Sequence, residues 1–147
     1  MIDSSIQNAA TAHLHTARVQ SSGGVAKRRG TILVVEDDAD IREMFRITLK
    51  AEGFHVLAVG DGMDALRVLE TAQPTLIVLD LGLPRLSGRD VAREVSSRAD
   101  LRHVPIVVVT GTDTSDFYAW VSCILHKPVD PDALVQIVKR CLAKESR

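Results

Sequence analysis

Short apolar runs alternate with longer segments of helical apolar spacing along the chain from residue 31. The runs are rich in Val, Ile and Leu, as strands buried on both faces are, and they cover residues 31–35, 55–59, 76–80, 105–110 and 123–126. In most of the segments that follow, apolar side chains recur every three or four residues, which predicts amphipathic helices. This alternation predicts an α/β fold, with an open parallel sheet and helices on both of its faces.

Capping residues indicate where several of these helices begin and end. The turn at Asp61–Gly62 opens the helix after the second strand, and Gly53 ends the helix before that strand. Asp130 as N-cap and Pro131 at the first helical position begin the last helix. Asp38 lies just ahead of the first helix, and we interpret it as a cap of that helix rather than as a ligand.

The third apolar run is unusual because it ends in a carboxylate, Asp80, within the stretch LIVLDLGLP. A buried carboxylate without a partner is strongly unfavourable, so Asp80 must lie at the wet tip of the strand or contact a cation. The carboxyl ends of parallel strands meet at one edge of a sheet. The polar residues that follow the other strands should therefore converge on Asp80, and they are Glu36, Asp37, Asp38, Thr110 and Lys127.

The residue types at this edge favour phosphoryl transfer. Repulsion among Glu36, Asp37 and Asp80 calls for a divalent cation, and hard oxygen ligands suit Mg²⁺. The metal and the ammonium of Lys127 would neutralise phosphoryl oxygens, and the hydroxyl of Thr110 would donate a hydrogen bond to one of them. Asp80 would then be the nucleophile and would form an acyl phosphate.

Four motifs, ILVVEDDADIRE, LIVLDLGLPRLSG, PIVVVTG and HKPVD, together resemble the receiver domain of two-component response regulators over residues 31–144. The resemblance implies a flavodoxin-like (βα)5 fold with strand order 2-1-3-4-5. It also implies a cis peptide bond between Lys127 and Pro128. The implied site residues are Asp80 as phosphoacceptor, Thr110 as switch hydroxyl, Lys127 as phosphate sensor, and Glu36, Asp37, Asp80 and the carbonyl of Gly82 as Mg²⁺ ligands.

The resemblance further implies that the phosphoryl group comes from a sensor histidine kinase or a histidine phosphotransfer protein, and that the signal passes to a downstream protein. We expect no catalysis beyond the chain's own phosphorylation and dephosphorylation. An aspartyl-phosphate hydrolase would need a second aspartate where this chain has Gly82. A phosphorylation-independent interaction module with a receiver fold remains the alternative function.

The chain departs from the family between Thr110 and Lys127. This interval is shorter than usual by about one helical turn, which predicts a shortened or irregular fourth helix in the region 111–126. Ile124 stands where the family has an aromatic switch residue. The sequence therefore does not show whether the region 111–126 still changes conformation on phosphorylation.

Composition adds the domain organisation. The chain has 147 residues and a formal net charge of −1, and its length predicts one domain. It has two cysteines without a CxxC motif, which predicts a reducing cytoplasm. Residues 1–30 are predicted to be a flexible tail and residues 31–147 the receiver domain. No run reaches the roughly 18 apolar residues that span a bilayer. We expect a stand-alone receiver domain with no DNA-binding domain and no membrane contact, and the oligomeric state stays open.

Overall fold

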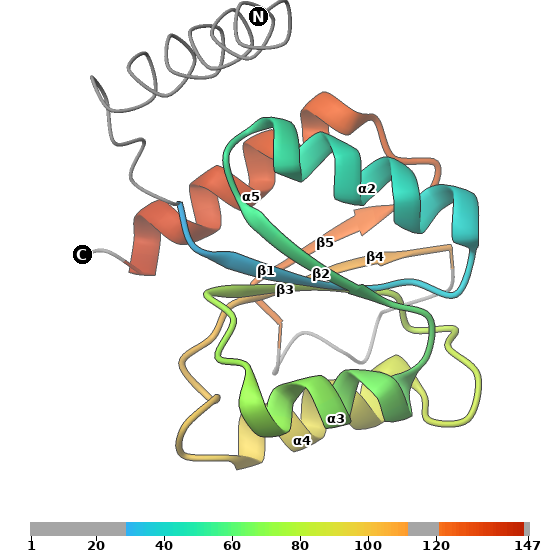
Figure 1. Ribbon diagram of the computed structural model, residues 1–147, viewed down its shortest axis with the longest axis vertical. Coiled ribbons are helices and arrows are strands. Elements are labelled where there is room, and N and C mark those ends of the chain that lie inside the picture. The colour runs from blue at the N-terminus through green and yellow to red at the C-terminus, as the bar shows by residue number, and fades with distance from the viewer. Residues whose placement is uncertain (1–28, 112–120, 146–147) are drawn as a thin grey trace, which may run out of the picture.

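The structure, a computed structural model, describes residues 29–111 and 121–145. In this part of the chain, five parallel strands form one sheet in the order β2-β1-β3-β4-β5, flanked by four helices (Figure 1). The strands are β1 (Thr31–Val35), β2 (His55–Val59), β3 (Leu76–Leu79), β4 (Ile106–Thr110) and β5 (Cys123–His126), and the helices are α2 (Ala39–Ala51), α3 (Gly62–Thr71), α4 (Gly88–Ser97) and α5 (Pro131–Glu145). The predicted α/β fold and its strand order are confirmed. None of these helices has the length and apolar character needed to cross a membrane.

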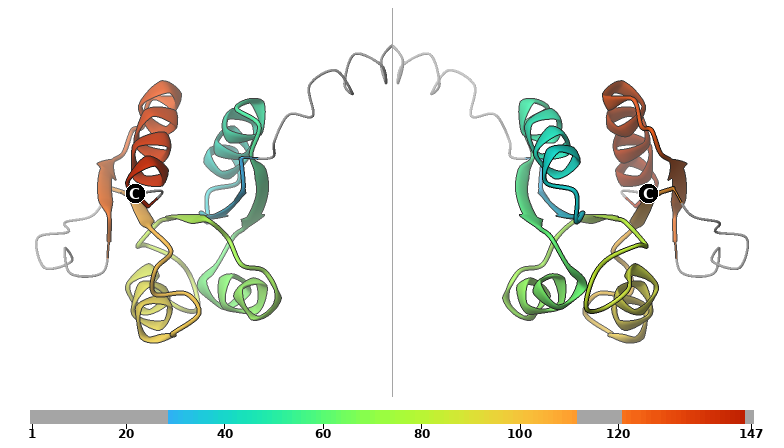
Figure 2. Two further views of the ribbon diagram at one scale, coloured as in Figure 1. Left: turned by 90° about the vertical axis from the view of Figure 1, so that its left-hand side faces the viewer. Right: turned by 90° about the vertical axis from the view of Figure 1, so that its right-hand side faces the viewer.

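The helices form two layers, one on each face of the sheet. Helices α2 and α5 cover one face, and α3 and α4 cover the other (Figures 1 and 2). Phe45, Leu49 and Val138 belong to the core cluster of the first face, whereas Leu69 and Val91 belong to that of the second. Successive strand side chains point to opposite faces, and every residue of β4 is buried. A continuous apolar run therefore supplies both core clusters at once.

Aspartate caps position the helices as the sequence predicts. The side chain of Asp38 accepts hydrogen bonds from two backbone N–H groups in the first turn of α2, at 2.9 and 3.0 Å. The side chain of Asp61 accepts one from the N–H of Asp64 at 2.9 Å. Helix α5 begins at Pro131, and Asp130 directly before it caps the first turn with its carboxylate. The interpretation of Asp38 as a helix cap is thus confirmed.

Two sequence predictions fall largely outside the described residues. The flexible tail was assigned to residues 1–30, of which only the last two are described. The shortened fourth-helix region spans 111–126, and residues 112–120 of it are not described. Both assignments stay predictions. Ile124, which lies on β5, is partly buried against the core cluster on the α3–α4 side of the sheet.

The loop after β3, which carries Asp80, packs closely against the first turns of two helices. A Cβ atom on Gly88 would lie 2.1 Å from the carbonyl oxygen of Asp80 and 2.6 Å from the Cα of Leu81. A Cβ atom on Gly62 would lie 2.2 Å from the carbonyl oxygen of Leu86. These neighbours are backbone atoms, so they cannot move aside unless the loop itself shifts. Both positions therefore require glycine.

We expect Gly88→Ala to lower the free energy of unfolding by at least about 2 kcal/mol, because the added methyl group overlaps backbone atoms in a packed region. Urea unfolding followed by circular dichroism measures the change. Gly82→Ala is the matched control in the same loop, since a Cβ atom there would meet nothing within 4 Å. Equal stabilities of the two variants would contradict this account of the loop.

Candidate functional site

Two carboxylates lie side by side at the carboxyl edge of the sheet. Glu36 directly follows β1 and Asp80 directly follows β3, and these strands are neighbours. The backbone N–H of Asp80 donates to the carbonyl of Val35 at 3.0 Å, which continues the strand pairing beyond the last residue of β3. Glu36 is only 1% exposed and Asp80 only 6% exposed. Each carboxylate therefore needs a partner.

Lys127 supplies the positive charge that both carboxylates need. It follows β5, and its backbone N–H donates to the carbonyl of Thr110 at 3.0 Å, which fixes it at the end of β4. Its Nζ lies 2.5 Å from Oε1 of Glu36 and 3.2 Å from Oδ2 of Asp80. The carboxylate that ends the third apolar run is thus both near the edge of the sheet and paired with a cation.

A third carboxylate, Asp37, completes an acidic cluster that fits a metal ion. Glu36, Asp37 and Asp80 each offer an oxygen atom, and these atoms lie within 4.8 Å of one another. Asp37 is exposed, so the cluster is accessible from solvent. Oε1 of Glu36 is buried and makes no well-aligned hydrogen bond despite its ion pair with Lys127. A buried carboxylate oxygen that is already paired with an ammonium is a suitable ligand for a hard cation such as Mg²⁺.

Burial and contacts shift the pKa values of the three partly enclosed groups in different directions. Burial raises the pKa of Glu36 to about 7, against the opposing effect of Lys127. Burial also acts to raise the pKa of Asp80. Hydrogen bonds with the Gly82 N–H and with Glu36, together with the charge of Lys127, outweigh burial and lower this pKa. Burial disfavours the Lys127 ammonium, yet both carboxylates together raise its pKa. At neutral pH, Asp80 is therefore ionised and Lys127 is charged.

We expect the metal-free protein to lose stability as the pH rises from about 5 to about 7. Glu36 has a pKa of about 7 in the folded chain and near 4.5 when unfolded, so the folded state binds more protons in this window. The loss should reach at most about 3 kcal/mol. Asp80 adds no slope here, because it is ionised in both states. Urea unfolding in EDTA at several pH values measures the slope, which Glu36→Gln should flatten; an unchanged slope in that variant would contradict the prediction.

Thr110 and Gly82, the other two predicted site residues, lie beside this group. Thr110 is the last residue of β4 and is fully buried. The N–H of Gly82 donates to Oδ1 of Asp80 at 3.2 Å, and the space around its Cα is open. The peptide bond between Lys127 and Pro128 is cis, as the resemblance implied. The roles assigned to the Thr110 hydroxyl and the Gly82 carbonyl stay predictions.

Two arginines that the sequence did not single out hold the loops of the site. Nη1 of Arg42 donates to the carbonyl of Glu36 at 2.8 Å, so the α2 side chain fixes the loop after β1. Arg85, in the loop after β3, has a φ of 64° and forms ion pairs with Asp61 and Asp64 at the start of α3. In neither case is the arginine separated from its partner by a helical or strand repeat, so sequence spacing does not predict these contacts. The only sequence signal for them was a basic residue near an acidic loop.

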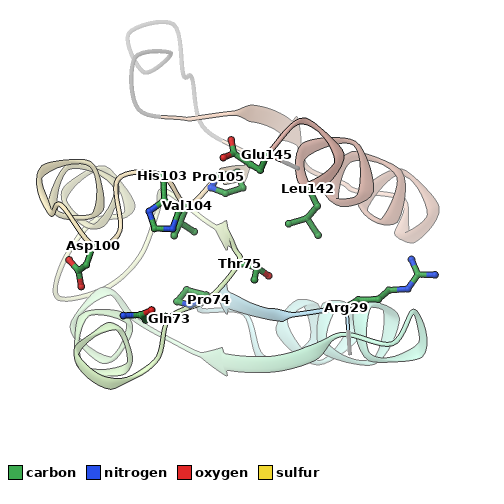
Figure 3. Close-up of a pocket in the computed structure, with 10 residues that line it drawn as sticks. All are labelled: Arg29, Gln73, Pro74, Thr75, Asp100, His103, Val104, Pro105, Leu142 and Glu145. Atoms are coloured by element: carbon green, nitrogen blue, oxygen red, sulfur yellow. The ribbon is translucent and has the colours of Figure 1, made fainter. Parts of the chain in front are cut away.

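A cavity of about 490 Å³ lies at the opposite, amino edge of the sheet (Figure 3). It opens between the ends of α3, α4 and α5 and the starts of the strands, and its wall includes Arg29, Thr75, His103, Pro105 and Leu142. None of the six predicted site residues lines it. The candidate site is therefore the carboxyl-edge cluster and not this cavity.

A comparison with models of known families shows which family the chain belongs to. The family model of the response regulator receiver domain matches residues 32–139. The chain belongs to this family. The matched range of the receiver domain includes all six predicted site residues, and the resemblance stated from the motifs is confirmed.

Individual relatives of this receiver domain include response regulators and the receiver domain of a sensor histidine kinase. The DNA-binding response regulator MtrA of Mycobacterium tuberculosis is 41% identical over 121 residues, which cover 79% of this chain and 52% of that protein. The chemotaxis response regulator CheY4 of Vibrio cholerae has a TM-score of 0.70 at 25% identity, over 76% of this chain and 97% of that one. The receiver domain of a sensor histidine kinase from Pseudomonas aeruginosa, with a magnesium ion coordinated in its active site cleft, has a TM-score of 0.71 at 28% identity and covers 78% of this chain and 98% of that one.

These relatives correct one expectation. A stand-alone receiver domain with no DNA-binding domain was expected, but MtrA relatives from several mycobacteria are DNA-binding response regulators. This chain spans about half the length of those proteins, 52%, so the match leaves the rest of each relative uncovered. The small net charge of these 147 residues could not reveal this, because it carries no information about residues outside them. The expectation of no DNA-binding domain is wrong.

Proposed function

We propose that Asp80 accepts a phosphoryl group from a histidine kinase or a histidine phosphotransfer protein in a Mg²⁺-dependent reaction, and that the phosphorylated receiver domain signals or relays to a protein partner. One observation carries the proposal. The Asp80 carboxylate is ionised yet almost buried, with Lys127 at one oxygen and the Gly82 N–H at the other. These two contacts orient the Asp80 carboxylate at the edge of the site, whereas a freely solvated carboxylate would have no fixed orientation.

In the proposed reaction, a carboxylate oxygen of Asp80 forms a bond to phosphorus while the phosphorus–nitrogen bond of the donor histidine breaks. The electron pair of that bond stays with the imidazole, which takes up a proton. Lys127 lies beside Asp80 before the reaction and can stabilise the charge of the arriving phosphoryl oxygens without rearranging. The hydroxyl of Thr110, at the end of the neighbouring strand β4, is assigned a hydrogen bond to one of them.

Glu36, Asp37 and Asp80 would hold Mg²⁺, with the carbonyl of Gly82 as a further predicted ligand. The ion supplies neutralisation of negative charge between the carboxylates and the phosphoryl group. Because the pKa of Glu36 is about 7, Mg²⁺ binding would favour its ionised form over its protonated form. Arg42 and Arg85 position the two loops that carry these ligands.

The chemistry proposed for the chain is limited to its own phosphorylation and the hydrolysis of its own acyl phosphate, so we do not propose an enzyme that acts on other substrates. We place the reaction in the cytoplasm, because two cysteines among 147 residues do not make the disulfide scaffold typical of secreted proteins.

Acetyl phosphate, a small phosphodonor, tests this function. The full chain is incubated with acetyl phosphate and Mg²⁺, and its intact mass is compared with that of a sample containing EDTA. We expect a phosphoryl adduct only with Mg²⁺, and we expect hydroxylamine to remove it, as it removes acyl phosphates. A chain that stays unmodified under these conditions would favour the phosphorylation-independent interaction module.

A further inference from the structure

The two cysteines of the chain meet in space although they are far apart in the sequence. Cys123 lies on β5 and Cys141 lies on α5. Their sulfur atoms are 3.3 Å apart, across 18 positions of sequence. These are the only cysteines among 147 residues. Strand β5 and helix α5 pack side by side (Figures 1 and 2), which brings the two thiols together.

The surroundings of the two thiols differ. Cys141 is on the buried side of α5 and is only 3% exposed. Cys123 is partly exposed, because β5 is the last strand of the sheet. Burial and the neighbouring Cys123 raise the pKa of Cys141 to about 12, so this thiol stays protonated. A solvent oxidant therefore reaches Cys123 first.

We propose that Cys123 and Cys141 form a redox-reversible disulfide, a modification site that reacts with hydrogen peroxide and joins β5 to α5. The sulfur atoms need to approach from 3.3 Å to the roughly 2.05 Å of a disulfide bond. Strand β5 leads directly to Lys127. The bond would thus restrain the strand that positions the lysine of the candidate site.

The chemistry balances in two steps. The sulfur of Cys123 attacks one oxygen of hydrogen peroxide, the oxygen–oxygen bond breaks, and a sulfenic acid and one water molecule form. The sulfur of Cys141 then attacks the sulfur of Cys123, and the sulfur–oxygen bond breaks. The departing hydroxide takes up the Cys141 thiol proton and leaves as a second water molecule. Two thiols are oxidised to one disulfide, and a dithiol reductant reverses the change by exchange.

Mass spectrometry of the full chain tests the proposal. After treatment with a small excess of hydrogen peroxide, we expect a monomer that has lost about 2 Da, the mass of two thiol hydrogens. Proteolysis without reductant should yield the Cys123 and Cys141 peptides linked to each other, and dithiothreitol should restore the original mass.

Two single variants provide matched controls. In Cys141→Ala, the sulfenic acid on Cys123 has no partner, so dimedone should trap it. In Cys123→Ala, the buried Cys141 should stay unmodified under the same treatment. The proposal is overturned if the wild-type peptides stay unlinked while Cys123 is oxidised to sulfinic acid, or if disulfides form only between chains. The readout does not depend on phosphorylation of Asp80.

Discussion

Replacing Asp80 with asparagine should reduce phosphorylation by acetyl phosphate to the background level while the chain stays folded. The amide of asparagine cannot form an acyl phosphate, although it has nearly the same shape as the carboxylate. Its single oxygen can still accept one of the two hydrogen bonds that Gly82 and Lys127 donate to the separate oxygens of Asp80. Incorporation of labelled phosphate after a fixed time, with circular dichroism as the check of folding, measures the effect.

A second aspartate serves as the control for this substitution. Asp132 is exposed in the first turn of α5, outside the acidic cluster, and Asp132→Asn should leave incorporation close to that of the wild type. If Asp80→Asn incorporated phosphate at the wild-type rate, Asp80 would not be the phosphoacceptor. If both variants lost incorporation equally, a general loss of negative charge would explain the result instead.

Replacing Asp37 with alanine should weaken Mg²⁺ binding by at least about 10-fold, because even the groups that only orient metal ligands commonly contribute about 10- to 100-fold to metal affinity. Asp37 is the exposed member of the acidic cluster, so its removal leaves the core intact. In the absence of Mg²⁺, the variant should be at least as stable as the wild type, since repulsion from Glu36 and Asp80 is relieved. Titration calorimetry with Mg²⁺ and thermal unfolding in EDTA measure the two effects.

Asp38→Asn is the matched control, because it removes a charge next to Asp37 and keeps an N-cap of nearly equal quality. Asp38 directs its carboxylate to the backbone of α2. Its loss should therefore change Mg²⁺ affinity by no more than about threefold, the effect of a screened neighbouring charge. Equal losses in Asp37→Ala and Asp38→Asn would contradict the assignment of Asp37 as a ligand.

The sequence predicted the convergence of the site because topology alone determines it. Five apolar runs with helices between them imply a parallel sheet, and the residues after parallel strands meet at one edge. This topology alone brings together Glu36, Asp80 and Lys127. The cap role of Asp38 was also readable, because local capping chemistry depends on sequence neighbours.

The sequence could not predict contacts that depend on side-chain packing. The short distance between Lys127 and Glu36 and the burial that raises the pKa of Glu36 to about 7 both depend on how three loops pack. The same is true of Arg42, whose partner lies six positions earlier at no regular spacing. Cys123 and Cys141 looked unrelated for this reason, since the contact exists only because α5 packs beside β5.

The location of the phosphoryl group tests the central claim most directly. The full chain is phosphorylated with acetyl phosphate and Mg²⁺, then treated with borohydride, which reduces an aspartyl phosphate to homoserine, and its peptides are sequenced by mass spectrometry. The account predicts homoserine at position 80 alone, and none when EDTA replaces Mg²⁺. Homoserine at another carboxylate, or the same yield at position 80 without Mg²⁺, would contradict it.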